Sequence, residues 1–221
     1  MSTKKKPIRY EFSEENETFV EETFTRFPVL NLDLTKRYTF ADLLTWTDYR
    51  LRELIDGFIH VMSYPLRIHQ RVSSKLYRAI DCFIVKNSGQ CHVYHPPFAV
   101  RLPIEGSNED GKIYNVLLPD ICVVCDLSKL DDKGCIGAPD LIVEILSPST
   151  AKNDWNKKFN LYEKAGVREY WIVNPKAKIV NVFVLQTDGE YDRGIEYDYT
   201  QKAPVHIFEG LEIDLKEVFE D

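Results

Sequence analysis

The chain has 221 residues, 44% of them hydrophobic and 29% charged, which is typical of a soluble globular protein with room for a sizeable core. Its formal net charge of −7 argues against a protein that coats nucleic acid generally, although an enzyme with a local basic surface remains compatible with it. No stretch of about 18 uncharged apolar residues occurs, so we expect no membrane span. The start, MSTKKKPIRYEF, has basic residues without a following apolar run, which argues against a secretory signal and favours the cytoplasm.

The cysteines are odd in number and scattered through the chain, so we expect buried thiols and no disulfide framework. They are Cys82, Cys91, Cys122, Cys125 and Cys135. Cys122 and Cys125 have the spacing of half a zinc site, but they lie in a strand-like run. Residues three apart on a strand point to opposite faces, and no second Cys or His pair completes such a site.

The first half of the chain predicts a leader, a hairpin and a long helix. Residues 1–37, rich in glutamate, are interpreted as a partly ordered leader. Thr39 is a plausible N-cap for a short helix. Residues 50–63 predict a hairpin, because Asp-Gly at 56–57 stands between two apolar runs. Apolar residues spaced by four and three predict a helix over 65–87.

The second half alternates strands with one further helix. Strands are predicted over 91–102 and 115–125, and a third, almost wholly apolar one over 139–146. After a helix cap at 147–150, a helix is expected over 151–165. The remaining predicted elements are strands at 168–174, 179–185, 190–199 and 206–208, and a last turn at 215–220. We expect one domain over residues 38–221, an α/β or α+β fold with a mixed central sheet flanked by helices.

Two carboxylates stand in strands that are otherwise apolar. Asp120 follows Pro119 in a run of Leu, Ile, Val and Cys, and Glu144 lies in the middle of the 139–146 strand. Burying a carboxylate is costly unless it is paired or bound to a metal. Hard oxygen ligands of this kind suit a Mg²⁺-like ion, which phosphodiester hydrolysis often requires.

Lys158 is the candidate cation for the same site. Trp155, Phe159 and Tyr162 form an apolar stripe on the predicted helix, and Lys158 projects from that inward side, whereas Lys157 lies about 100° around the helix. The alternative is that Lys158 only extends along the edge of the stripe to solvent. The spacing leaves both interpretations open.

Asp140 competes with Asp120 for the role of ligand. It shares a strand face with Glu144, but four strand residues separate the two by roughly 13 Å, too far for one ion to bridge. Asp140 follows Pro139 at the start of the strand, so a turn or edge role is favoured.

Several motifs resemble the Uma family, a bacterial group of restriction-endonuclease-type proteins in the PD-(D/E)XK nuclease superfamily. The resemblance rests on GAPDLIVEILSPST (137–150), then Asp154, Lys158 and Tyr162, then GVREYWIVNP (166–175). ELIDG (53–57), His69-Gln70 and LPDI (118–121) also match. It covers about residues 38–219, with the motifs in the family order.

The resemblance implies a restriction-endonuclease-like core and a metal-dependent endonuclease that cuts DNA with Mg²⁺ or Mn²⁺. Asp120 would supply the aspartate of the PD motif and Glu144 the acid of the next strand, with the backbone carbonyl of Ile145 as a further metal ligand. The strict pattern has lysine two residues after that acid, where this chain has Leu146, so the lysine would have moved to Lys158 on the next helix. Many such nucleases act as dimers, so a homodimer is expected.

Three more residues match or adjoin family positions. Glu53 would reach the site as a ligand or water organiser, unless it is a surface carboxylate. His69, at the start of the long helix, would meet phosphate or cap the helix, or have no role in the chemistry. Asp154 would orient Lys158, or only favour the early turns of its helix through the dipole.

A basic stripe follows the 65–87 helix opposite its apolar face. Its members are Arg67, Arg71, Lys75 and Arg78. A solvated charged face and contact with nucleic-acid phosphates are both compatible with it.

Two other functions compete with the nuclease. A non-catalytic module that binds nucleic acid or protein on the same fold would explain the acidic charge and the lysine missing from the strand. A hydrolase of a different phosphate ester is the second alternative.

Overall fold

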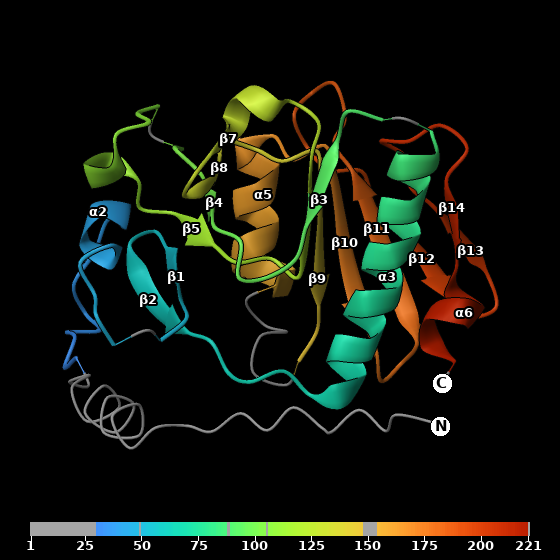
Figure 1. Cartoon of the computed structure of the whole chain (residues 1–221), viewed down its shortest axis with the longest axis horizontal. Coiled ribbons are helices and arrows are strands. Elements are labelled where there is room, and N and C mark those ends of the chain that lie inside the picture. The colour runs from blue at the N-terminus through green and yellow to red at the C-terminus, as the bar shows by residue number, and fades with distance from the viewer. Residues whose placement is uncertain (1–29, 49, 88, 105, 148–153, 221) are drawn as a thin grey trace, which may run out of the picture. The chain divides into compact units, whose positions relative to one another are not determined.

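Figure 1 shows the computed structural model, which describes residues 30–220 apart from 49, 88, 105 and 148–153. The chain divides into two compact units. One comprises residues 33–45 and 50–221 and contains every helix and strand described below. The other comprises residues 1–32 and 46–49. Most of the predicted leader, and most of the predicted cap at 147–150, fall outside the described residues, and the predicted domain limits stay a prediction.

The larger of the two layers of strands is a mixed sheet, called here the central sheet, in the order β12-β11-β10-β9-β6-β3. Strands β9 and β10 are parallel, and the other neighbours are antiparallel. The strands are β3 (His92–Tyr94), β6 (Ile121–Val124), β9 (Leu141–Ile145), β10 (Glu169–Asn174), β11 (Ile179–Val184) and β12 (Ile195–Asp198). The central sheet confirms the predicted mixed α/β architecture.

A second sheet of short strands, called here the outer sheet, has the order β2-β1-β5-β4-β8-β7. Only β4 and β8 are parallel neighbours among its described strands. The strands are β1 (Arg52–Ile55), β2 (Phe58–Val61), β4 (Val100–Arg101), β5 (Val116–Leu117), β7 (Leu130–Asp131) and β8 (Gly134–Ile136). The β7–β8 hairpin was not predicted.

Helices cover the two faces of the central sheet (Figure 1). On one face α3 (Arg67–Lys86) packs with α6 (Leu215–Phe219), and on the other α5 (Phe159–Ala165) packs together with the outer sheet. The shorter helices are α2 (Phe40–Leu43), η1 (Asp110–Lys112), η2 (Leu127–Lys129) and η3 (Asp154–Lys158). The predicted helix over 65–87 is confirmed within a residue or two.

The alternation along β9 decides which way Glu144 faces. Leu141, Val143 and Ile145 belong to the core beneath α3, whereas Ile142 belongs to the core between the central sheet and α5. Because successive side chains on a strand point to opposite faces, Glu144 lies on the same face as Ile142. Its carboxylate is thereby directed toward α5.

The two long strands predicted over 91–102 and 115–125 are each broken in the middle. Pro96 and Pro97 separate β3 from β4, and Pro119 separates β5 from β6. Proline has no N–H for a sheet ladder and restricts the residue before it, so a strand that meets one ends there. At both breaks the chain passes between the outer and central sheets, and Asp120 lies at the second break and not inside a strand.

The predicted hairpin is confirmed in register and in turn type. Glu53 pairs with His60 and Ile55 with Phe58. Asp56 and Gly57 both have positive φ, 52° and 82°, as a type I′ turn requires. At Gly57 an added Cβ would lie 3.0 to 3.1 Å from Arg37, Tyr38 and Tyr114, so the position also lacks room for a side chain.

The expectation that all cysteines are thiols was wrong. Cys91 and Cys125 form a disulfide, while Cys122 and Cys135 are buried thiols and Cys82 is exposed. The reason lies in the register of β3 and β6, in which His92 pairs with Val124, so that the next pair outward brings Cys91 opposite Cys125. That pairing joins residues 34 apart in the sequence and cannot be read from their spacing.

One C-terminal prediction also needs correction. The residues predicted as a strand at 206–208 form a turn, and the strands that flank this turn are β13 (Lys202–Pro204) and β14 (Glu212–Asp214), which pair with each other. Ile207 donates its N–H to the buried side chain of Glu169 and not to a strand partner. The short apolar run at 207–208 is therefore part of a half-buried turn.

Helix α3 should be held in place by its buried face. Leu76 is fully buried, so Leu76→Ala removes packed atoms and is expected to lower the free energy of unfolding by about 2–5 kcal/mol. Val85, on the same helix, is 71% exposed, so Val85→Ala should change the free energy of unfolding by less than about 0.5 kcal/mol. Urea unfolding measures both. Equal losses in the two variants would contradict the described packing of α3.

Candidate active site

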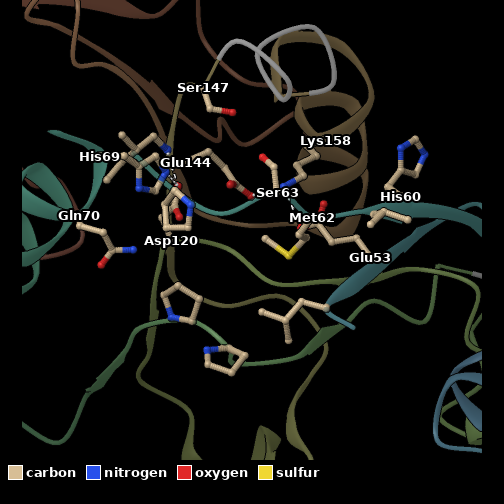
Figure 2. Close-up of a pocket in the computed structure, with 16 residues that line it drawn as sticks. Glu53, His60, Met62, Ser63, His69, Gln70, Asp120, Glu144, Ser147 and Lys158 are labelled. Carbon is tan, nitrogen blue, oxygen red and sulfur yellow. Dashed lines mark hydrogen bonds and ion pairs between the residues drawn. The ribbon is translucent and has the colours of Figure 1, made fainter. Parts of the chain in front are cut away.

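A cavity of about 400 Å³ opens where the first hairpin, the start of α3 and the end of β9 meet. Its polar lining contains the residues that the sequence singled out, drawn in Figure 2: Glu53, His69, Asp120, Glu144 and Lys158. These residues come from five separate segments of the chain. All are at least nine-tenths buried.

Asp120 is held at the break between β5 and β6 by two contacts. Its Oδ2 accepts a hydrogen bond from the backbone N–H of Ile145 at 2.7 Å and lies 3.1 Å from Nε2 of His69. The pairing of Ile121 with Val143 places Asp120, one residue earlier, opposite Glu144. The two carboxylates and the Ile145 backbone are thus neighbours at the end of two antiparallel strands.

Lys158 connects Glu144 with the outer sheet. Its Nζ donates to Oε1 of Glu144 at 3.0 Å and to Oε1 of Glu53 at 2.8 Å. The same oxygen of Glu53 accepts the backbone N–H of Leu118, two residues before Asp120, at 3.0 Å. Glu53 therefore ties the lysine to the segment that carries the aspartate, and the interpretation of Glu53 as a surface carboxylate is wrong.

Lys158 reaches this position from the end of η3, a single turn of π-helix before α5. Lys158 is only 2% exposed, which confirms that it faces inward, whereas the neighbouring Lys157 is exposed. Trp155, which the predicted stripe included, is 41% exposed, because the wider π turn changes the direction of successive side chains. Single π turns of this kind are frequent at functional sites.

Asp154 and Tyr162 complete the surroundings of Lys158 and Glu144. Oδ1 of Asp154 lies 3.6 Å from Nζ of Lys158, and the Asp154 carbonyl accepts the hydroxyl of Tyr170 at 3.1 Å. The Tyr162 hydroxyl donates to Oε1 of Glu144 at 2.7 Å. In the sequence Tyr162 belonged to the apolar stripe and to the motifs shared with the family, and no role in the site was predicted for it. A tyrosine at a fully buried position needs a polar partner, and this was the signal available for its role.

The charges of the cluster are strongly coupled. Burial lowers the pKa of Lys158, but Glu144, Glu53 and Asp154 outweigh it and keep that pKa well above its usual value. Burial raises the pKa of Glu144 well above its usual value, with Lys158 opposing and Asp154 and the other acids adding to the rise. Three carboxylates thus surround one ammonium, and the site favours the protonated form of Glu144 more than water does.

His69 is the basic partner of Asp120. Burial lowers the pKa of His69, but the hydrogen bond and charge of Asp120, together with the Ile145 backbone, raise it above its usual value. The imidazole is 3.1 Å from the Asp120 carboxylate, so it is an ion-pair partner when protonated. His69 is thus placed in the site and not on the outside of α3.

The donor set fits a hard divalent cation. Over the described ranges no three His, Cys, Asp or Glu side chains are arranged as a metal cluster. Mg²⁺, however, is usually bound by one or two carboxylates and keeps several waters. Asp120, Glu144 and the Ile145 carbonyl are oxygen donors of that kind, and a cation beside them would offset the repulsion among the acids that helps to raise the pKa of Glu144.

Two further predicted residues have other partners. Asp140 accepts hydrogen bonds from the Cys125 N–H at 2.7 Å and from Arg168 at 3.0 Å, as expected of a residue at a strand edge. Lys75, in the basic stripe, donates to the carbonyl oxygens of Glu217 and Glu220 at the end of α6. The lysine thus joins α3 to α6, and phosphate contact by Arg67, Arg71 and Arg78 stays a prediction.

Comparisons with known proteins concern the family and the fold. A family model named Uma2 and described as "Putative restriction endonuclease" matches residues 40–216. A protein of Synechocystis, named only as the uncharacterized protein slr1290, is 26% identical over 140 residues, which are 63% of this chain and 68% of that protein. The crystal structure of a "putative nuclease belonging to DUF820" from Anabaena variabilis is similar in fold, with a TM-score of 0.64 and 21% identity, covering 82% of this chain and 97% of that one. The family match covers well over half of the chain and confirms the resemblance found in the sequence: the protein belongs to the Uma2 family.

Proposed function

We propose that the protein is a metal-dependent endonuclease that hydrolyses phosphodiester bonds of DNA. The observation that carries the proposal is the convergence of two buried carboxylates, Asp120 and Glu144, with a buried lysine, Lys158, in one open cavity. Membership of the Uma2 family supports the nuclease class. Three charged groups taken out of water at one place are costly, and a cluster of this kind is a frequent sign of a functional site.

Asp120, Glu144 and the Ile145 carbonyl would hold Mg²⁺ or Mn²⁺. When bound, the ion supplies positive charge that polarises the scissile phosphate and lowers the pKa of a water nucleophile. Lys158 holds a proton at Nζ and places its charge beside Glu144, where negative charge develops on the phosphate. Glu53 and Asp154 fix the ammonium, and Tyr162 orients the carboxylate of Glu144.

DNA as the substrate, a homodimer as the active form and the cytoplasm as the compartment belong to the same proposal. Within the described residues no helix has both the length and the apolar character needed to cross a membrane. A dimer would bring two copies of the site to one nucleic-acid molecule. The competing function is a non-catalytic binding module, which would retain the fold and the cavity without turnover.

Removal of either acid should abolish cleavage. Asp120→Ala and Glu144→Ala each remove a carboxylate from the metal-binding set, so plasmid cleavage in Mg²⁺ or Mn²⁺ should fall by about 100-fold or more. Calorimetry with Mn²⁺ should show weaker binding in both variants. Glu196→Ala, at an exposed position on β12, is the matched control and should cleave like the wild type. A wild type that neither cleaves above these variants nor binds metal would favour the binding module.

The Lys158→Met variant tests the contribution of the Lys158 charge separately from the packing of its side chain. It removes the ammonium while keeping most of the chain length, so cleavage should fall by about 100-fold, and unfolding at neutral pH should become easier by about 3–5 kcal/mol. The pKa of Glu144 is raised in the folded protein, so the folded state holds its proton more tightly than the unfolded state. The stability lost at neutral pH should therefore return as the pH falls toward the usual glutamate range.

Lys157→Met is the control for this variant, since Lys157 is the exposed neighbour. Its cleavage and unfolding should match the wild type at every pH. Urea unfolding between pH 5 and 8 tests whether the stability of Lys158→Met falls as the pH rises. A Lys158→Met protein that becomes more stable as the pH rises would contradict the assigned ion pairs.

A further inference from the structure

The cavity is lined by charged residues, called here the floor, and by apolar side chains, called here the apolar wall. Leu51, Val61, Met62 and Pro65 line it from the first hairpin and the segment that follows, and Pro96 and Pro97 line it from the segment between β3 and β4. Figure 2 shows Met62 next to the charged residues. Among the described lining residues Lys158 is the one lysine or arginine, and its ammonium is already bonded to Glu53 and Glu144.

The apolar wall continues onto the surface as what we call the apolar rim: Leu51, Val61, Tyr64 and Leu66. Their exposed fractions are 47%, 60%, 100% and 59%. Leu51 and Val61 also line the cavity, and Tyr64 lies between Ser63 and Pro65, which both line it. The four residues therefore lie on the two short segments, 51 and 61–66, that contribute to the lining of the cavity. Large exposed apolar side chains concentrated near a cavity mark a binding surface more often than scattered ones do.

We propose that this site takes a nucleic-acid strand with unpaired bases, and that the apolar rim binds those bases. The inference rests on the proposed nuclease function for the identity of the ligand. A duplex presents phosphates outward and hides the faces of its bases, so its binding depends on neutralising cations. Only an unpaired base offers a π-face to an exposed tyrosine, and such stacking tolerates any base sequence.

The size of the cavity supports the same ligand. About 400 Å³ lies within the range of pockets that enclose one small molecule, and thus one nucleotide with its base against the apolar wall. Enzymes that act on a nucleotide in such a pocket take a single strand or turn the nucleotide out of its duplex. With the base on the wall, its phosphate would face Asp120, Glu144 and Lys158 on the floor.

Binding can be measured separately from cleavage. Fluorescence anisotropy in EDTA, with a labelled single strand of mixed sequence and the duplex of that sequence, should show tighter binding of the single strand. Tyr64→Ala should weaken single-strand binding by roughly 5- to 100-fold, the usual range for losing one stacked base, and should leave duplex binding unchanged. Tyr64→Phe keeps the ring and should bind within about twofold of the wild type.

Tyr199→Ala is the matched control, because Tyr199 is also an exposed tyrosine but follows β12 at the far edge of the central sheet. It should bind like the wild type. Since Tyr64 is fully exposed, its replacement should leave urea unfolding unchanged, so a loss of binding cannot be assigned to misfolding.

The inference is overturned if the duplex binds as tightly as the single strand, or if Tyr64→Ala binds like the wild type. It is also overturned if Tyr64→Ala changes the oligomeric state in light scattering while binding is kept, because the rim would then be covered by a second copy of the chain. Cleavage of both oligonucleotides in Mn²⁺, measured in parallel, tests the proposed function by itself. If both oligonucleotides are cleaved but neither binding nor cleavage depends on Tyr64, the proposed role of the apolar rim is wrong and the proposed nuclease function stands. If binding depends on Tyr64 but no cleavage occurs, the proposed nuclease function is wrong and the role of the rim stands.

Discussion

The burial of the Lys158 ammonium among three carboxylates is the interaction on which the rest of the site depends. Glu53 comes from the outer sheet, Glu144 from the central sheet, and Asp154 from the turn that carries the lysine itself. An ion pair out of water is stable only when its partners are placed well, because desolvation of each charge costs several kcal/mol. The lysine therefore joins the outer sheet, the central sheet and α5 at one point, and the same point forms the floor of the cavity.

The proline breaks explain how one chain supplies both sheets around this point. Pro96-Pro97 and Pro119 end strands that would otherwise run on, and at each break the chain crosses between the central and the outer sheet. Asp120 gains its position from the second break, where it is free of the strand ladder and accepts the Ile145 N–H. A carboxylate in the interior of β6 would have been buried in the core instead of facing the cavity.

The excess of acid over base gives the site its chemical character. Glu53, Asp120, Glu144 and Asp154 outnumber Lys158 and His69 in the cluster, and the proposed metal site rests on this arrangement. Apolar side chains also line the cavity, and exposed apolar side chains lie on the same chain segments. The proposed ligand, one nucleotide of an unpaired strand, would place its phosphate on the charged residues and its base on the apolar ones.

The fold class, the type I′ hairpin and the long helix α3 were predictable from the sequence, since they follow from local periodicity and turn chemistry. The helical spacing left the direction of Lys158 open, and its burial and ion pairs in the folded chain settle it. The sequence also indicated Asp120 and Glu144, because an acid in an apolar run is conspicuous. Only the tertiary structure decided that Cys91 meets Cys125, that Glu53 reaches Lys158 and that Tyr162 bonds to Glu144. Those contacts join residues that are distant in the sequence or turned by a π-helical turn, and their partners follow from strand register and sheet order, which local patterns do not specify.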